Sequence, residues 1–304
     1  MKPDIPMLGS ADHSRGQALL SGLVAGLHNH LQRHPQFARL LRPWLHSIRI
    51  IARHTLKRAM LALLRNLPDH WTKDMVFLDP DLHKHGGKRY SQNDEDGIIE
   101  YLFSVISPRY RYFVEIGAEP ASGQTLGIGG MECNCRLLWE RGWSGLFIDG
   151  NQYSPEHDVR RERITPMNAN EVFRKYGVPH EIDLLSIDID GQDFWVWSNL
   201  SYSPRVVIVE YNPAFGPDES KTIPFDPTYT WDGTRWYGAS LRALQRLGES
   251  RGYTLVYANG VNAFFVRDEL LGNASAFSFE RIHGFRGRLE HIQPDPHDRP
   301  WVTI

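Results

Sequence analysis

A chain of 304 residues is long enough for one large α/β domain with an appended segment, or for two modest domains. Its composition is 41% hydrophobic and 23% charged, with nine Trp, twelve Tyr and fourteen Phe, which excludes a chain disordered throughout. The net charge of −2 is unevenly distributed, because residues 1–75 carry eleven Lys/Arg against four Asp/Glu. Two cysteines, Cys133 and Cys135, are too few for a disulfide framework and favour a reducing cytoplasm.

Residues 1–75 are predicted to form a basic helical extension. Leucines recur at helical spacing over residues 19–31 and 56–67, and a proline ends the helical pattern after each. The most apolar run, residues 18–27, is about half the ~20 residues that span a bilayer, so the chain is not expected to cross a membrane.

Two interpretations of this extension remain open. It is either a helical cap on the main domain or on a second subunit of a homo-oligomer, or a basic amphipathic segment on an anionic membrane surface through residues 15–67. Both fit a cytoplasmic protein, in the second case at the inner face of the membrane. No nucleic-acid partner is expected, because the cations lack the exposed aromatic residues that stack on single strands.

After a linker at residues 76–89, short apolar runs alternate with helical segments, which predicts a mostly parallel sheet over residues 90–267. The expected strands are Tyr112–Ile116, Trp143–Ile148, Arg163–Met167, Ile182–Ile187, Arg205–Val209, Tyr253–Tyr257 and Val261–Val266. The last two flank Asn259-Gly260, which predicts an antiparallel β-hairpin. A parallel series that ends in such a hairpin is typical of the seven-stranded, Rossmann-like class I methyltransferase fold. Residues 268–304 form a C-terminal tail without a predicted role.

Polar residues follow the expected strands, at the sheet edge where open α/β folds bind ligands. Glu115 and Gly117 close the first strand, and the glycine lets the backbone approach a ligand. Asp149 closes the second, where a carboxylate can accept hydrogen bonds from both hydroxyls of a ribose. Asn168 follows the third and is a candidate to meet an adenine edge. For Asp149 and Asn168 the alternative is an ordinary loop residue.

Asp188 and Asp190 stand two apart after the fourth strand, as Glu210 and Asn212 do after the fifth. Residues two apart on a strand point to the same side, and neighbouring strands lie ~4.8 Å apart. Asp188, Glu210 and Asn212 are therefore candidate ligands of Mg²⁺, which would lower the pKa of a substrate hydroxyl. Asp188 and Asp190 are the candidate catalytic residues, with Asp190 as general base. In the alternative, Asp188 contacts only the cosubstrate, and Glu210 and Asn212 stabilise the local structure.

Six segments together resemble FkbM-type methyltransferases: Tyr90–Asp96, Phe113–Gly117, Gly142–Asp149, Ile182–Gly191, Val207–Asn212 and Tyr237–Leu241. The resemblance covers residues 90–267 and implies S-adenosylmethionine as methyl donor and an oxygen nucleophile. By position it implies a donor-binding set of Ser91, Gln92, Glu115, Gly117, Asp149, Asn168 and Asp188. The expected cation ligands are similar to those of magnesium-dependent O-methyltransferases. Residues 119–123 depart from the family pattern, which leaves the contacts of this loop undefined.

The sequence thus favours an O-methyltransferase that acts on a hydroxyl of a small molecule or glycan. The alternatives are a dinucleotide-dependent oxidoreductase, and a non-catalytic S-adenosylmethionine-binding module tethered to a membrane or an assembly. The Asn259-Gly260 hairpin and the absence of a glycine triplet after the first strand count against the oxidoreductase. Residues 213–236, rich in proline and aromatic residues, are expected to form either a substrate lid or an ordered insertion.

Overall fold

The computed structural model describes residues 76–120, 131–151, 158–283 and 292–304. The basic extension expected over residues 1–75, with its membrane and subunit interpretations, lies outside them. The chain divides into two units, Met1–Phe77 with Leu271–Asn273, and Leu78–Leu270 with Ala274–Ile304. Within the described part of the first unit, Val76 forms a parallel bridge with Leu271. Among the described residues, no helix has the length and hydropathy that a membrane span requires.

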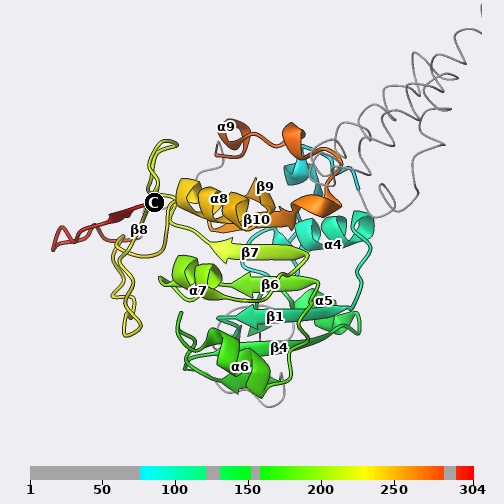
Figure 1. Cartoon of the computed structure of the whole chain (residues 1–304), viewed down its shortest axis with the longest axis horizontal. Coiled ribbons are helices and arrows are strands. Elements are labelled where there is room, and N and C mark those ends of the chain that lie inside the picture. Colours follow the sequence, from blue (N-terminus) through cyan, green and yellow to red (C-terminus); the bar gives the residue numbers. More distant parts are fainter. Residues whose placement is uncertain (1–75, 121–130, 152–157, 284–291) are drawn as a thin grey trace, which may run out of the picture. The chain divides into compact units, whose positions relative to one another are not determined.

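A seven-stranded sheet forms the centre of the second unit, in the order β5-β4-β1-β6-β7-β10-β9 (Figure 1). Its strands are β1 (Tyr112–Ile116), β4 (Ser144–Asp149), β5 (Val159–Arg161), β6 (Leu184–Ile187), β7 (Val206–Glu210), β9 (Tyr253–Ala258) and β10 (Asn262–Arg267). The strands from β5 to β7 pair in parallel, whereas β10 runs antiparallel to both of its neighbours, β7 and β9. This is the Rossmann-like class I methyltransferase topology, so the expected fold class is confirmed.

The third strand is a correction to the sequence prediction. The structure places it at Val159–Arg161 and not at Arg163–Met167. Pro166 has no N–H to donate to a strand ladder, and the chain around it turns into the following helix. The sequence pattern did not indicate a strand at Val159–Arg161, because this segment is short, lies at the sheet edge and carries two arginines.

Helices cover both faces of the sheet. On one face lie α6 (Ala169–Lys175), α7 (Asp193–Asn199) and α8 (Leu241–Ser250), and on the other lie α4 (Glu95–Val105) and α5 (Arg136–Glu140) (Figure 1). Trp197 of α7 is fully buried, and its ring centroid lies 4.8 Å from that of Phe265 on β10. The helix α8 begins where Ser240 accepts a hydrogen bond from the N–H of Ala243, because a serine at this position satisfies an otherwise unpaired amide. Parallel strands covered in this way are continuous apolar runs.

The described residues also form several smaller elements outside the central sheet and its helices. Two short ladders are β2 (Glu119–Pro120) with β3 (Met131–Glu132), and β8 (Lys221–Thr222) with β11 (Val302–Thr303). The remaining elements are α9 (Phe279–Ile282) and the 3-10 turns η2 (Leu82–His85), η4 (Asp268–Leu270) and η5 (Ala274–Ala276).

The predicted hairpin connects β9 and β10. Gly260 has a φ of 97°, which glycine adopts without steric cost. The side-chain oxygen of Asn259 accepts the backbone N–H groups of Val261 and Asn262 and closes the turn. The hairpin brings Asn262 directly opposite Glu210, at the end of β7.

Candidate active site

A cavity of about 720 Å³ lies at the carboxyl ends of the parallel strands. Small-molecule and cofactor sites have volumes of roughly 300–1,000 Å³. The wall is formed by the ends of β1, β4, β6 and β7, by the start of β10, and by residues of the 213–236 connection. The chain leaves β1 toward β4 on one side and returns to β6 on the other, so the cavity lies at the switch in strand order, where open α/β folds bind ligands.

Gly117 allows two strand ends to approach each other closely. Its φ is 90°, and its N–H donates to the carbonyl of Ile148 at 2.8 Å. A Cβ atom at this position would lie 1.6 Å from the carbonyl oxygen of Asp188. Only glycine therefore fits between β1 and β6 here.

Glu115 holds the loop that leads into α5. Its two carboxylate oxygens accept the backbone N–H groups of Asn134 and Cys135, each at 2.7 Å. Burial raises the pKa of Glu115 to about 7, although these hydrogen bonds act in the opposite direction. Both cysteines are buried with free thiols, and burial raises the thiol pKa of each. The Glu115 carboxylate therefore orients this loop.

The other residues of the expected donor-binding set divide into two groups. Asp149 and Gln92 line the cavity together with Glu115, Gly117 and Asp188. One oxygen of Asp149 accepts the N–H of Asn151 at 2.7 Å, which fixes the carboxylate at the end of β4.

Ser91 and Asn168 do not line this cavity. Ser91 is fully buried, and its hydroxyl donates to Asp96 at 2.9 Å. The amide of Asn168 bonds within its own loop, with its oxygen to the N–H of Thr165 and its nitrogen to the carbonyl of Arg163. The geometry thus gives both side chains a local structural role.

Three carboxylates gather at the ends of β6 and β7. Asp188, Asp190 and Glu210 each have an oxygen within 4.8 Å of the others. Asp190 has a φ of 56°, a left-handed conformation that is uncommon outside glycine and recurs at functional sites. Asp193 stabilises this loop, because its carboxylate accepts the N–H groups of Ile189 and Gly191 at 2.8 Å.

The charges of this carboxylate cluster are poorly compensated. Burial raises the pKa values of Asp188 and Glu210, and repulsion from neighbouring carboxyl groups raises them further. The Oε2 atom of Glu210 is buried and has no hydrogen-bond partner among the described residues. Carboxylate oxygens are the preferred ligands of Mg²⁺ and Ca²⁺, so this donor set fits a hard divalent cation.

Asn212, one of the expected cation ligands, has both ends of its amide bonded within the chain. Its amide nitrogen donates to the carbonyls of Arg235 and Tyr237, and its oxygen accepts the N–H of Ala214. The strand β7 ends at Glu210, so the two-residue alternation of a strand does not extend to Asn212. Asn212 joins the two ends of the 213–236 connection, and Asp190 is the third member of the carboxylate cluster.

The 213–236 connection, here named the roof segment, is held against both sides of the cavity. On one side, Arg163 donates to the carbonyl of Tyr229 at 2.8 Å. On the other, the side chain of Gln192 donates to Pro224 and accepts the N–H of Asp226. Tyr229, Thr230 and Trp231 line the wall. The roof segment is therefore an ordered insertion that contributes to the cavity.

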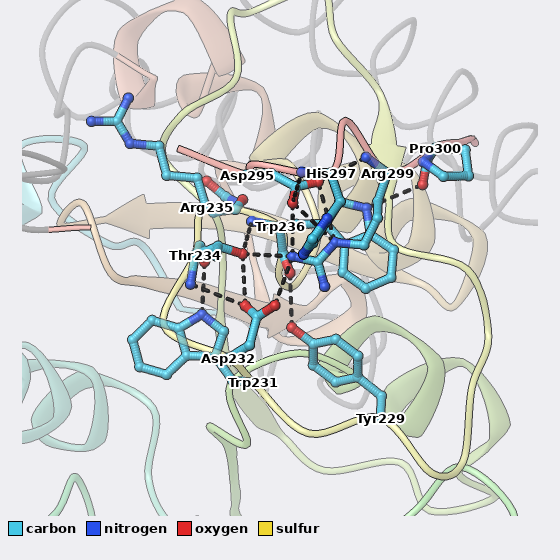
Figure 2. Close-up of polar contacts among 11 residues, drawn as sticks. Tyr229, Trp231, Asp232, Thr234, Arg235, Trp236, Asp295, His297, Arg299 and Pro300 are labelled. Carbon is cyan, nitrogen blue, oxygen red and sulfur yellow. Dashed lines mark hydrogen bonds and ion pairs between the residues drawn. The ribbon is translucent and has the colours of Figure 1, made fainter. Parts of the chain in front are cut away.

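The C-terminal residues 292–304, here named the strap, pack against the roof segment through several polar contacts (Figure 2). Arg299 donates to Thr234 at 2.8 Å, pairs with Asp232 at 2.8 Å and Asp295 at 3.0 Å, and its guanidinium carbon lies 4.2 Å from the ring centroid of Trp236. The strap ends in β11, which pairs with β8. Sequence reasoning missed the strap, because its partners lie more than fifty positions away and follow no local periodicity.

The cavity wall is strongly acidic. Its acidic residues are Glu115, Asp149, Glu162, Asp188, Asp190 and Glu210. Arg163 is the only lysine or arginine among the described lining residues. A wall of this charge favours ligands that carry positive charge.

Comparisons with known proteins give a distant structural likeness. No family model and no curated protein sequence matches the chain. A structure of MycE methyltransferase from the mycinamycin biosynthetic pathway, in complex with Mg and SAH, matches with 16% identity and a TM-score of 0.33, and covers 54% of this chain and 46% of that one. A MycE structure with Mg, SAH and mycinamycin VI matches with 17% identity and a TM-score of 0.31, covering 53% and 45%. The chain spans about half the length of these structures.

Proposed function

We propose that this chain is an S-adenosylmethionine-dependent O-methyltransferase that uses a divalent cation, with a hydroxyl of a sugar, glycan or other small molecule as acceptor. The observation that carries the proposal is the convergence of Gly117, Asp149 and Asp188 on one cavity at the switch point of a class I methyltransferase sheet. The ends of three successive strands thereby form one ligand site.

The donor is proposed to lie across the ends of β4, β1 and β6. Asp149 would accept hydrogen bonds from the ribose hydroxyls, and the loop at Gly117 would approach the donor with its backbone. Two strand spacings of ~4.8 Å separate β4 from β6, which leaves about 10 Å for an extended nucleoside and amino-acid conjugate. The acidic wall suits the positive sulfonium and ammonium groups of this donor.

The cation is proposed to lie among Asp188, Asp190 and Glu210, whose buried, unpartnered oxygen fits that assignment. A bound Mg²⁺ would hold the acceptor hydroxyl and lower its pKa. Asp190 is the exposed member of the three, and partial loss of solvation with repulsion from Asp149 raises its pKa. Because Asp190 is the member of the three that an acceptor hydroxyl can reach, it is the proposed proton acceptor.

The acceptor is proposed to lie under the roof segment. Tyr229 and Trp231 offer aromatic surface beside the hydroxyl of Thr230, a mixture that suits a ligand with both apolar and polar groups. The indole N–H of Trp231 is already bonded to the carbonyl of Thr234 at 2.7 Å, which fixes the edge of the ring.

Calorimetric titration with S-adenosylmethionine, S-adenosylhomocysteine and NAD tests this proposal. We expect both sulfur compounds to bind and NAD to give no heat. Asp149→Ala should weaken S-adenosylhomocysteine about tenfold or more, because hydrogen bonds to charged groups contribute about 1.5–3 kcal/mol. Asn168→Ala is the matched control, since its side chain lies outside the cavity wall, and it should bind like the wild type.

The alternatives predict different results. Tight NAD binding without a response to either sulfur compound would indicate the oxidoreductase. Donor binding without methyl transfer to any member of a hydroxylated acceptor panel would indicate a non-catalytic binding module.

A further inference from the structure

Two buried oxygen atoms border the cavity at the junction of β7 and β10. Asn262 and Glu210 lie directly opposite each other in the antiparallel ladder, and both line the cavity. Their residues are 1% and 8% exposed. Neither Oδ1 of Asn262 nor Oε2 of Glu210 has a hydrogen-bond partner among the described residues. Opposed residues of an antiparallel pair project to the same face, so their side chains are neighbours.

A hydrogen bond with Glu95 fixes the orientation of the Asn262 amide. The Nδ2 atom of Asn262 donates to Oε1 of Glu95 at 3.1 Å. Burial alone would raise the pKa of Glu95, but hydrogen bonds from Asn262 and Asn259 hold it below its usual value, so the carboxylate is ionised. A flipped amide would turn its oxygen toward this carboxylate. The oxygen of Asn262 is therefore the atom left without a protein partner.

Two hydrogen-bond acceptors cannot satisfy each other, and buried polar groups without partners are rare in folded proteins. A proton on Glu210 would bridge the pair in the absence of a ligand, and a divalent cation would replace that proton. The carboxylates of Asp188 and Asp190 lie within 4.8 Å of Glu210 and supply the remaining negative charge. Amide and carboxylate oxygens occur together as ligands of hard cations.

The methyl donor is a poorer partner for Asn262 than the cation. The strand β10 lies four positions from β4, which carries the proposed ribose ligand Asp149. At ~4.8 Å per strand this separation is about 19 Å, beyond the reach of the amino group of a donor anchored at Asp149. Asn262 therefore serves the end of the cavity that holds Glu210.

We propose that Asn262 is a fourth oxygen ligand of the divalent cation, and that Glu95 is a positioning residue that aims its amide oxygen. This inference rests on the proposed cation site at Asp188, Asp190 and Glu210. It assigns to the start of β10 the amide ligand that the sequence pattern suggested at Asn212.

Mn²⁺ affinity, measured by electron paramagnetic resonance on the 304-residue chain, tests this assignment without an acceptor. We expect Asn262→Ala to weaken Mn²⁺ binding by about 10- to 100-fold, and Glu95→Gln to weaken it by about tenfold, because Glu95 acts only through the amide that it orients. Asn212→Ala is the matched control. Asn212 is equally buried, at 1% exposure, and both ends of its amide are bonded within the chain. Its loss should lower the melting temperature and leave Mn²⁺ affinity unchanged.

Wild-type Mn²⁺ affinity in folded Asn262→Ala would overturn the assignment, as would weakening confined to Asn212→Ala. If Asn262→Ala does not fold, Glu95→Gln decides, because it keeps the size of the side chain and removes the charge that orients the amide. A wild-type chain that binds no Mn²⁺ would overturn both the cation site and this inference. Titration of the same sample with S-adenosylhomocysteine then shows separately whether donor binding, and with it the proposed function, survives.

Discussion

At the scale of single residues, the site depends on backbone positions that few side chains tolerate. Gly117 and Gly142 both have a positive φ, of 90° and 78°. They differ in surroundings, because a Cβ atom on Gly117 would overlap the carbonyl oxygen of Asp188, whereas a Cβ atom on Gly142 meets nothing within 4 Å. Alanine substitutions at these two positions therefore separate the free-energy cost of backbone strain from the cost of a steric clash inside the site.

Gly117→Ala should therefore lose S-adenosylhomocysteine binding, whereas Gly142→Ala should keep it. Backbone strain alone costs about 1–2 kcal/mol, so both variants should melt at a lower temperature than the wild type. Gly117→Ala should melt lowest, because β1 and β6 must also move apart. Differential scanning fluorimetry and calorimetric titration measure the two effects. Equal donor affinity in the two variants would show that the loop at Gly117 does not approach the ligand.

At the scale of secondary structure, local patterns predicted most of the sheet and little of what covers the cavity. Apolar runs such as Tyr112–Ile116 predicted buried strands, because burial on both faces of a parallel sheet produces continuous apolar sequence. The same logic placed Glu115, Asp149 and Asp188 at strand ends. It does not extend to Asn212, which lies beyond the end of its strand, and it did not single out Asn262, whose proposed role depends on a cross-strand neighbour. The strap was missed because only tertiary contacts define it.

The contacts between the strap and the roof segment lead to a prediction about stability. Arg299→Ala removes an ion pair, a hydrogen bond and a ring contact from the roof segment at once. The free energy of unfolding should fall by about 1–2 kcal/mol, which would lower the melting temperature by about 2–8 °C for a domain of this size. Chymotrypsin should then cleave faster at Trp231 or Trp236, while S-adenosylhomocysteine affinity stays unchanged, because the proposed donor site lies at the strand ends.

Arg141→Ala is the control for Arg299→Ala, since it breaks only an exposed ion pair with Glu100, and such pairs contribute little. Cleavage at the same rate in both variants would mean that the strap does not hold the roof segment in place.

At the scale of the whole molecule, the fold concentrates carboxyl groups at one sheet edge and removes them partly or fully from water. The pKa values of five of them are raised in the folded state, with burial as the largest cause: Glu115, Asp188, Asp190, Asp193 and Glu210. Such groups bind protons more tightly in the folded than in the unfolded chain, so their contribution to stability falls as the pH rises above the ordinary carboxyl pKa. Carboxyl groups with lowered pKa values, such as Asp295 at about 2, titrate below this range.

The melting temperature of the cation-free chain should therefore fall between pH 5 and pH 8. The pKa of Glu115 is raised from 4.5 to about 7, so this group alone would lower the free energy of unfolding by up to about 3 kcal/mol across that window. Glu115→Gln should give a shallower slope than the wild type, which isolates the contribution of this carboxyl group. Mn²⁺ should stabilise the chain more at pH 8 than at pH 5, because the cation competes with protons for the carboxylates. A wild-type melting temperature that is flat or rises over this range, measured by scanning fluorimetry in matched buffers, would contradict the cost assigned to burying these carboxylates.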